Sequence, residues 1–403
     1  MQKIYLFLFS FIILSANAQS LVFEGKIVDK VSEETIPFVN IIVQNSTQGV
    51  ISNEEGAFKF YIPKDAEHIE VSHIGYKTQT FSVNHIKSEP LTIYLEADEM
   101  ALEEVIVTNK PINQILAGIL DHSKQQLDKN IKLETYYREF VKINGTYSKF
   151  ADGLIDFYLQ PKRKTKIEAN LIVDQSRAFQ LAEKGEIEQK GKLDLSELDS
   201  FFDIQKAANS FFSYEIVEGI SNKKSSEKYD FELRSKKDHE GKTVEIIHVM
   251  PKSSVKEALL EGKITYDPVQ RIVLDIDLKM SDKHKQYVKM RNVLLFKFAL
   301  HDIQIKQAYK YVNEKYIPAY KKSIIDLHIK FGKQMDDRMM CISDLVVTDF
   351  NDNVTALPGK ESYFRERSLY HNGMNYSENF WETSNTLPLS ENEERILQTL
   401  KNK

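Results

Sequence analysis

Apolar and polar positions alternate in short runs near the start of the chain. Residues 57–62 place Phe58 and Phe60 on one face of an extended strand and polar side chains on the other. Pro63 ends this strand, because proline has no N–H to donate to a β-ladder. Similar runs recur from 21 to 107 at intervals of roughly 8–12 residues, with turn residues between them, and this spacing is typical of an all-β sandwich.

Longer alternating runs follow from about residue 132. In residues 273–279, the sequence Val-Leu-Asp-Ile-Asp-Leu-Lys predicts a strand with one buried face and one wet face. Turn residues between such runs occur at 238–241, 267–268 and 313–315. The pattern predicts a long, curved antiparallel sheet, and the fold class is therefore mainly β, with a larger antiparallel β-rich α+β domain after the sandwich.

Helical spacing interrupts the β pattern in three places. After Pro111, apolar residues recur at spacings of three, four and seven: Ile112, Ile115, Leu116, Ile119, Leu120 and Leu127. Because the polar face of this linker helix mixes acidic and basic residues, packing on a sheet is favoured over a membrane surface. A second helix is predicted over 194–208, and Ser390 with Glu393 forms a capping box before a short third helix.

The N-terminus has the pattern of a secretory signal. Residues 1–18 combine Lys3, an apolar stretch and an Ala-Asn-Ala cleavage site, so the mature chain is expected to begin at Gln19. No later segment has the ~20 uncharged apolar residues of a membrane-spanning helix. These features predict an exported protein of the periplasm or outer-membrane periphery, with no transmembrane segment after cleavage.

Charge and cysteine content disfavour two further functions, nucleic-acid binding and cysteine-based catalysis. The formal net charge of −5 becomes −6 when Lys3 is removed, which disfavours nucleic acid as a partner. Cys341 is the single cysteine, so no internal disulfide can form. It lies in an apolar stretch, and we interpret it as a small buried hydrophobe rather than a nucleophile.

Several ordered motifs in the first domain support a family resemblance. They are Gly25, the sequence Pro-Phe-Val-Asn at 37–40, Gly49, the acidic-Gly-x-Phe turn at 55–58 and Ser-His-Ile-Gly-Tyr at 72–76. This pattern resembles the carboxypeptidase-regulatory-like domain of Gram-negative envelope proteins. The resemblance implies a seven-stranded transthyretin-like sandwich without catalytic residues of its own.

The expected domains follow from these observations. They are a signal peptide at 1–18, a carboxypeptidase-regulatory-like sandwich at 19–98, a linker with an amphipathic helix at 99–130, an antiparallel β-rich domain of unknown function at 131–355 and a C-terminal tail with a short helix at 356–403.

Three further segments resemble known families. Residues 100–110 resemble the segment after this domain in TonB-dependent transporters, but the remaining chain lacks the length and the series of ~10-residue strands of a large barrel. The hairpin at 259–280 faintly resembles the sheets of lipoprotein carriers. The motif at 134–140 and the segment 379–397 together resemble a companion region of carboxypeptidase-regulatory-like proteins, and no activity follows from that resemblance.

The acidic turn Asn53-Glu54-Glu55-Gly56 is the first candidate for chemistry. An EF-hand calcium loop needs further oxygen ligands beyond the glycine, where this sequence has Phe58 and other core positions. We therefore predict a hairpin turn, with Gly56 at positive φ and the acidic side chains in water.

Other candidate sites also have plainer explanations. Ser221 and Lys224 fit S-x-x-K only within a solvated loop, and Asp275 with Asp277 is expected on the wet face of its strand rather than as a glycosidase pair. Asn144 begins a formal glycosylation sequon that is expected to form a hairpin turn. The pair Phe380-Trp381 is expected to anchor the tail on the core rather than to stack on a ligand.

No motif indicates a catalytic, cofactor or metal site. The ten histidines show no zinc-peptidase spacing, and neither a G-x-S-x-G elbow nor a Gly-rich phosphate loop is present. We expect no catalytic, cofactor-binding or metal-binding residues and no cofactor. The favoured function is a non-enzymatic envelope protein with a structural or protein-binding role. A carrier for a lipid or other apolar ligand and a hydrolase without a recognisable motif are the alternatives.

Overall fold

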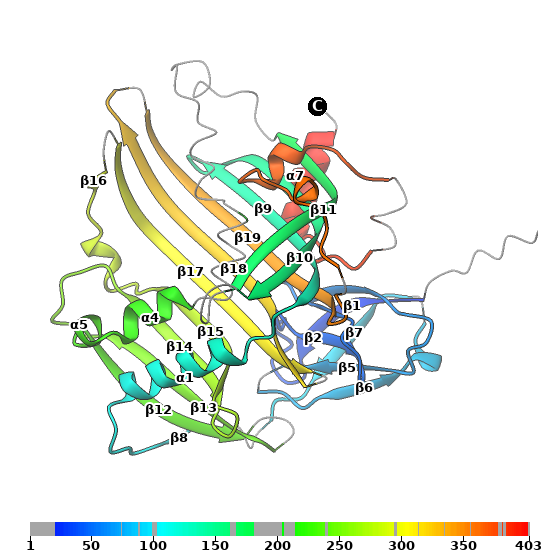
Figure 1. Ribbon diagram of the computed structural model, residues 1–403, viewed down its shortest axis with the longest axis horizontal. Coiled ribbons are helices and arrows are strands. Elements are labelled where there is room, and N and C mark those ends of the chain that lie inside the picture. Colours follow the sequence, from blue (N-terminus) through cyan, green and yellow to red (C-terminus); the bar gives the residue numbers. More distant parts are fainter. Residues whose placement is uncertain are drawn as a thin grey trace, which may run out of the picture.

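The computed structural model contains two β domains joined by a helix (Figure 1). It describes residues 21–98, 103–161, 167–180, 204, 214–237, 241–293 and 296–401, without positions 74, 88, 313, 334, 355, 378–380 and 382–383. The expected signal peptide and nearly all of the helix predicted over 194–208 lie outside these residues.

The first domain is a sandwich of two sheets. Within the described residues its strands are β1 (Val22–Asp29), β2 (Asn40–Val43), β3 (Gly49–Ile51), β4 (Ala57–Tyr61), β5 (His68–Ser72), β6 (Gln79–Ser82) and β7 (Leu91–Leu95), with the 3₁₀ turn η1 (Val83–His85) between the last two. They pair in the orders β4-β1-β7 and β3-β2-β5-β6. Phe58 and Phe60 point into the shared core, as their alternation predicts. The seven-stranded sandwich is confirmed.

The second domain is built on a single large sheet. Twelve described strands belong to it, in the order β11-β10-β9-β19-β18-β17-β15-β14-β13-β12-β8, with β16 paired to β17. Their bounds are β8 (Glu104–Val105), β9 (Ile131–Ile143), β10 (Thr146–Pro161), β11 (Ile167–Gln180), β12 (Tyr229–Lys237), β13 (Thr243–Pro251), β14 (Leu260–Asp267), β15 (Ile272–Met280), β16 (Arg291–Val293), β17 (Phe296–Val312), β18 (Lys315–Phe331) and β19 (Met335–Asn351). All of these pairings are antiparallel.

Two details refine the expected boundaries and turns. The segment expected to be a plain linker contributes β8, which pairs with β12 at the edge of the large sheet. Asn144 and Gly145 form the tight turn between β9 and β10, at φ of 50° and 84°, which confirms the hairpin expected there.

Helices cover one face of the large sheet, which we call the helix face. The linker helix is α1 (Ile112–Gln126), which lies against β15 and β12 and buries Leu116, Ile119 and Leu120 in the same core cluster as Ile276 and Leu278 of β15. The short helices α4 (Glu215–Ser221) and α5 (Lys223–Ser226) lie beside it, and α4 joins the same core. The prediction that this amphipathic helix packs on a sheet is confirmed.

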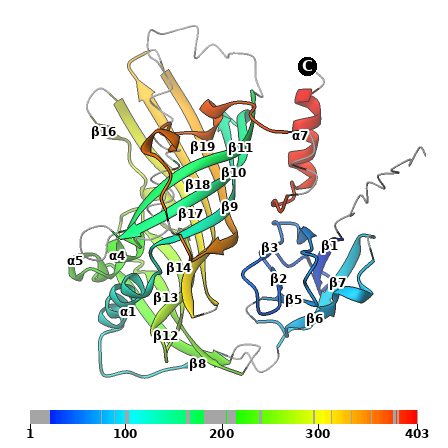
Figure 2. The ribbon, with the colours of Figure 1, turned by 45° about the vertical axis from the view of Figure 1, so that its right-hand side comes forward.

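The opposite face of the large sheet carries the first domain and the end of the tail, and we call it the docking face (Figure 2). Ile51 of the first domain packs there against Tyr136, Tyr320 and Val346, and Phe38 stacks on Tyr320 with ring centroids 5.1 Å apart. The expectation that this face is wet is therefore wrong where the first domain and tail cover it. The sequence pattern marks the polar face but cannot reveal that another domain covers it.

The tail contains the 3₁₀ turns η4 (Lys360–Ser362) and η5 (Leu369–Asn372) and the helix α7 (Glu391–Lys401), while η3 (Lys285–Tyr287) lies in the large domain. The capping box before α7 is confirmed, because Ser390 N–H donates to Glu393 Oε2 at 2.7 Å and Glu393 N–H donates to Ser390 Oγ at 3.3 Å. In the described part of the chain, no helix is both long enough and apolar enough to cross a membrane.

Candidate functional site at the domain junction

A row of ionisable side chains crosses the docking face. Strand partners are set side by side by the register, and the row takes one residue from each of ten neighbouring strands. These residues are Arg177, Asp152, Arg138, Asp344, Lys322, Lys306, Asp277, Lys263, His248 and Glu232, in order from β11 to β12. The first domain and tail cover the part of this row around Arg138 and Lys322.

Arg138 is the buried centre of the row. Its Nε and Nη2 donate to Asp344 Oδ2 at 3.2 and 2.8 Å, and Tyr320 Oη donates to Asp344 Oδ1 at 2.8 Å. Burial alone would raise the pKa of Asp344, but Arg138 and Lys322 outweigh it and hold that pKa below its usual value. The pair therefore stays ionised although both side chains are almost completely buried.

A second buried carboxylate adjoins this centre. Asp152 Oδ1 accepts from Arg177 Nε at 2.7 Å, and Asp152 Oδ2 accepts from Tyr136 Oη at 2.9 Å. Trp381 of the tail lies over the Arg177 guanidinium, which is 4.3 Å from the ring centroid. Trp381 thus anchors the tail, as expected, while its neighbour Phe380 lies outside the described residues.

The acidic turn of the first domain meets this part of the sheet. Asn53 is 2% exposed, and its Oδ1 accepts from the backbone N–H groups of Glu55 and Ala57, both at 2.9 Å. Gly56 has φ of +74°. The predicted turn with Gly56 at positive φ is therefore confirmed, but it is not a hairpin, because β3 and β4, the strands on either side of it, belong to different sheets of the sandwich. Among the described residues, no group of three or more His, Cys, Asp or Glu is placed to hold a metal ion.

The acidic side chains of this turn are not simply left in water. Glu54 forms an ion pair with Lys322 of β18, and Glu55 Oε2 accepts from the N–H of Glu391 at 3.1 Å. Asn53 Nδ2 donates to the carbonyl of Pro388 at 3.3 Å. The expectation of solvated acids holds for Glu54, which stays exposed, but not for Glu55, which is partly buried; the sequence gives no sign that the turn contacts the second domain and the tail.

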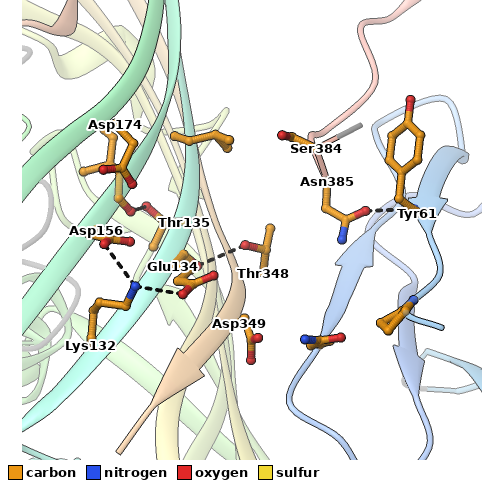
Figure 3. A pocket seen from close by; sticks show the side chains of 14 residues that line it. Tyr61, Lys132, Glu134, Thr135, Asp156, Asp174, Thr348, Asp349, Ser384 and Asn385 are labelled. Carbon is orange, nitrogen blue, oxygen red and sulfur yellow. Dashed lines mark hydrogen bonds and ion pairs between the residues drawn. The ribbon is translucent and has the colours of Figure 1, made fainter. Parts of the chain in front are cut away.

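A cavity of about 530 Å³ lies at the same junction (Figure 3). The first domain, the large sheet and the tail all line it. Its lining residues include Tyr61 of the first domain, Lys132, Glu134, Asp156 and Asp174 of the sheet, and Ser384 and Asn385 of the tail. Asn385 also closes one wall, because its Oδ1 accepts from the N–H of Tyr61 at 2.9 Å.

Carboxylates outnumber cations on the sheet side of this cavity. Lys132 Nζ lies 2.8 Å from Glu134 Oε1 and 3.0 Å from Asp156 Oδ2, and these bonds outweigh desolvation and raise the pKa of Lys132. Burial also raises the pKa of Asp156. Asp174 keeps solvent contact, but partial desolvation and the nearby Asp156 carboxylate raise its pKa to about 6. The sheet side of the cavity is therefore acidic, and its exposed carboxyl group, Asp174, has a raised pKa.

The other residues considered from the sequence lie elsewhere. Cys341 is buried in an apolar cluster with Val141, which agrees with its interpretation as a hydrophobe. Ser221 donates to the carbonyl of Glu218 at 3.3 Å, and Lys224 is exposed on α5, a short helix rather than the loop expected.

Asp275 and Asp277 do share one face of β15, but that face is only partly wet. Both side chains are partly buried, and Lys306 Nζ lies 3.6 Å from Asp277 Oδ2. Desolvation, followed by repulsion from Asp277, raises the pKa of Asp275 to about 7. The prediction of a solvated pair is therefore wrong for Asp275, since burial on the docking face was not visible in the alternation.

Comparison with known proteins defines the first domain. Residues 23–107 match the family model of the CarboxypepD_reg-like domain. The protein is thus a mainly β chain that begins with a carboxypeptidase-regulatory-like sandwich. No curated protein sequence matches it.

Two solved structures share weak similarity with the chain. A DUF1329 family protein from Desulfovibrio piger ATCC 29098 is 8% identical, with a TM-score of 0.23 over 61% of this chain and 93% of that one. A lipovitellin structure concerned with lipid–protein interactions is 10% identical, with a TM-score of 0.26 over 66% of this chain and 29% of that one. TM-scores this low carry no argument about fold or function.

Proposed function

We propose that the protein is a non-enzymatic exported protein of the cell envelope, at the periplasm or outer-membrane periphery, which binds another envelope protein. The signal-like residues 1–18 support export, and the carboxypeptidase-regulatory-like domain supports an envelope role by resemblance. The partner would bind at the junction of the first domain, the docking face and the tail.

This proposal rests on what the buried charged side chains bind. Arg138, Asp344 and Lys322 have the burial and ionisation of functional groups, yet in the described structure they bind other parts of the same chain. Lys322 joins the first domain to the sheet, and Arg138 joins the sheet to the tail, so these charges build a composite surface rather than a reaction centre. Such a surface, with a polar cavity at its centre, is suited to holding a partner.

Site-specific crosslinking in the native envelope would test this proposal. A photoreactive side chain at Ser384, on the cavity rim, should give one discrete crosslinked protein, whereas the same group at the exposed Val269 should not. If Ser384 gives no discrete protein adduct in envelopes that contain the folded protein, the binding role is contradicted.

The carrier hypothesis receives less support. A carrier needs the apolar positions of the large sheet to line a cavity, whereas described helix-face residues such as Leu133 and Tyr137 are buried in the core cluster that also contains α1. Native mass spectrometry of protein purified from its own envelope tests it directly, since a stoichiometric lipid adduct would favour the carrier.

A hydrolase is a second candidate, supported by the carboxyl groups of Asp156 and Asp174 in one cavity. Raised carboxyl pKa values in a cleft are typical of acid–base sites. Chromogenic ester and glycoside substrates would test it. Turnover with an apparent pKa near 6 that Asp174→Asn removes would establish the activity, and turnover insensitive to this change would exclude the site.

A further inference from the structure

One segment of the tail contacts both domains at once, and we call residues 384–397 the strap. The strap includes the start of α7, which stands beside the large sheet and above the first domain (Figure 2). On the side of the first domain, Tyr61 N–H donates to Asn385, and Asn53 Nδ2 donates to the carbonyls of Pro388 and Leu389 at 3.3 and 3.4 Å. Glu55 Oε2 also accepts from the N–H of Glu391, so the first domain holds the strap through one backbone N–H and the side chains of Asn53 and Glu55.

On the sheet side, two leucines of the strap are buried and one carboxylate is partly buried. Leu387 is 4% exposed and joins the cluster of Tyr136 and Tyr320, while Leu397 packs with Phe140. Between these anchors, Glu393 Oε2 accepts from Arg138 Nη1 at 3.2 Å.

Arg138 Nη1 also donates to the carbonyl of Pro388, at 3.4 Å. Because Asn53 donates to the same carbonyl, Pro388 is held from both domains. Surfaces that recognise peptides use the same contacts: buried apolar anchors, a charged hydrogen-bond pair between them, and side chains that donate to the peptide's carbonyl groups.

We infer that the surface under the strap, formed by Tyr136, Arg138, Phe140 and Tyr320, is a peptide-binding site, which we call the seat. In this structure the chain fills the seat with its own segment, and a partner segment of the same chemistry would replace the strap. This inference rests on the proposed function and specifies the partner of that site. The partner would present an extended apolar stretch with leucine anchors, followed by a carboxylate that reaches Arg138.

The chemistry of the seat determines this choice of partner. Arg138 is cationic and buried, so an occupant that covered it without an anion would leave part of its charge uncompensated. Tyr136, Tyr320 and Phe140 offer aromatic surface to leucine side chains. The strap meets both requirements, with Leu387 before Glu393, and it has the advantage of being tethered. A tether of this kind gives an effective concentration of order millimolar, so a free segment competes only when the strap is weakened.

A labelled peptide of residues 384–401 tests the inference on the full-length chain. Fluorescence anisotropy would compare the wild-type protein with the variant Leu387→Ala/Glu393→Gln, which loosens the strap but leaves the seat unchanged. We expect the variant to bind the peptide at least tenfold more tightly than the wild type. Leu357→Ala, at a leucine 45% exposed outside the strap, is the matched control and should bind it as the wild type does.

Changes in the peptide keep the test independent of protein folding. Peptides carrying Glu393→Gln or Leu387→Ala should bind the loosened protein at least fivefold more weakly than the unchanged peptide. Equal binding of all three peptides, or no gain on loosening the strap in a protein whose circular dichroism matches the wild type, overturns the inference. Glu393→Gln alone serves if the double variant does not fold. The crosslink from Ser384 reports on the proposed function separately, since a partner can bind the junction without occupying the seat.

Discussion

Arg138 and Glu139 are neighbours on β9 that hold the C-terminal tail on opposite faces of the same sheet. Arg138 binds Glu393 on the docking face. Glu139 Oε1 accepts from Ser368 Oγ at 2.5 Å and from Tyr370 N–H at 3.1 Å on the helix face. The tail thus passes around the outer edge of the sheet.

The passage around the edge is itself hydrogen-bonded. Ser176 on β11 and Asn375 in the tail exchange backbone hydrogen bonds, each of 2.9 Å. Because β11 is the outermost strand of the sheet at this side, the tail protects part of an edge that would otherwise be open to pairing with another chain.

Removing the charge of Glu139 should release the first half of the tail. In Glu139→Gln, Ser368 and Tyr370 lose a charged acceptor, and hydrogen bonds to charged groups contribute about 1.5–3 kcal/mol. Hydrogen exchange should accelerate in 368–375 more than in α7. Glu104→Gln, at an exposed position, is the control, and unchanged exchange in 368–375 would contradict this role.

The ion pair between Glu54 and Lys322 should contribute modestly to docking of the first domain. Lys322 is almost buried but Glu54 is 57% exposed, so solvent screening limits the pair to roughly 0.5–1.5 kcal/mol. A double-mutant cycle with Glu54→Gln and Lys322→Met, followed by denaturant unfolding, should measure a coupling energy in this range. A coupling energy indistinguishable from zero would show that this ion pair does not contribute to docking.

Substitution of Gly56 should destabilise the first domain. At φ of +74° a side chain is strained, and a Cβ would lie 2.5 Å from the carbonyl oxygen of Ile27, so Gly56→Val should cost at least about 2 kcal/mol. Gly145→Ala is the matched control: φ is +84° with open space around it, and strain alone costs about 1 kcal/mol. Thermal unfolding measures the effect of both substitutions.

Adding a chelator should leave the melting temperature of the wild type unchanged. A lower melting temperature in the chelator would indicate that the turn at Gly56 binds a metal ion.

Asp275 should make stability depend on pH near neutrality. Its pKa is raised from 3.8 to about 7 in the folded protein by burial and by Asp277, against the opposing effect of Lys263, Lys306 and Lys236. The folded state therefore favours the protonated carboxyl, and this contribution is complete below about pH 4 and lost as the pH rises through 7.

Asp275→Asn removes this dependence. The variant should match the wild type below about pH 4 and exceed it in stability by roughly 2–4 kcal/mol above pH 7. Denaturant unfolding from pH 4 to 8 would measure the difference, and a constant offset across that range would show that Asp275 does not titrate there.

Local patterns were sufficient to predict the first domain. Alternation at Phe58 and Phe60 and the turn at Gly56 each reflect interactions within a few residues, and the structure confirms them; the helical spacing at Leu116 predicted the linker helix in the same way. The antiparallel character of the second domain was also predictable from its long alternating runs.

The junction site was not predictable, because its partners are far apart in the chain. Arg138 and Asp344 are separated by 206 positions, and alternation places each on a polar face without showing which strands are neighbours. The same limitation explains why the partner of Glu54 and the burial of Asp275 were not predicted. The motif containing Arg138 and the segment containing Glu393 were noted only as resemblances, and their direct contact supplies the physical connection between them.

The row of charges across the docking face has a consequence for how the strands find their alignment. A slip of one residue would turn a strand's charged position toward the apolar helix face. A slip of two would preserve the faces, but it would set Arg138 against Ile342 or Val346 instead of Asp344. β17, β18 and β19 have 17 residues each, long enough for such shifts to keep many backbone hydrogen bonds. The row thus distinguishes the native register from near neighbours that backbone pairing and hydrophobic alternation would both tolerate.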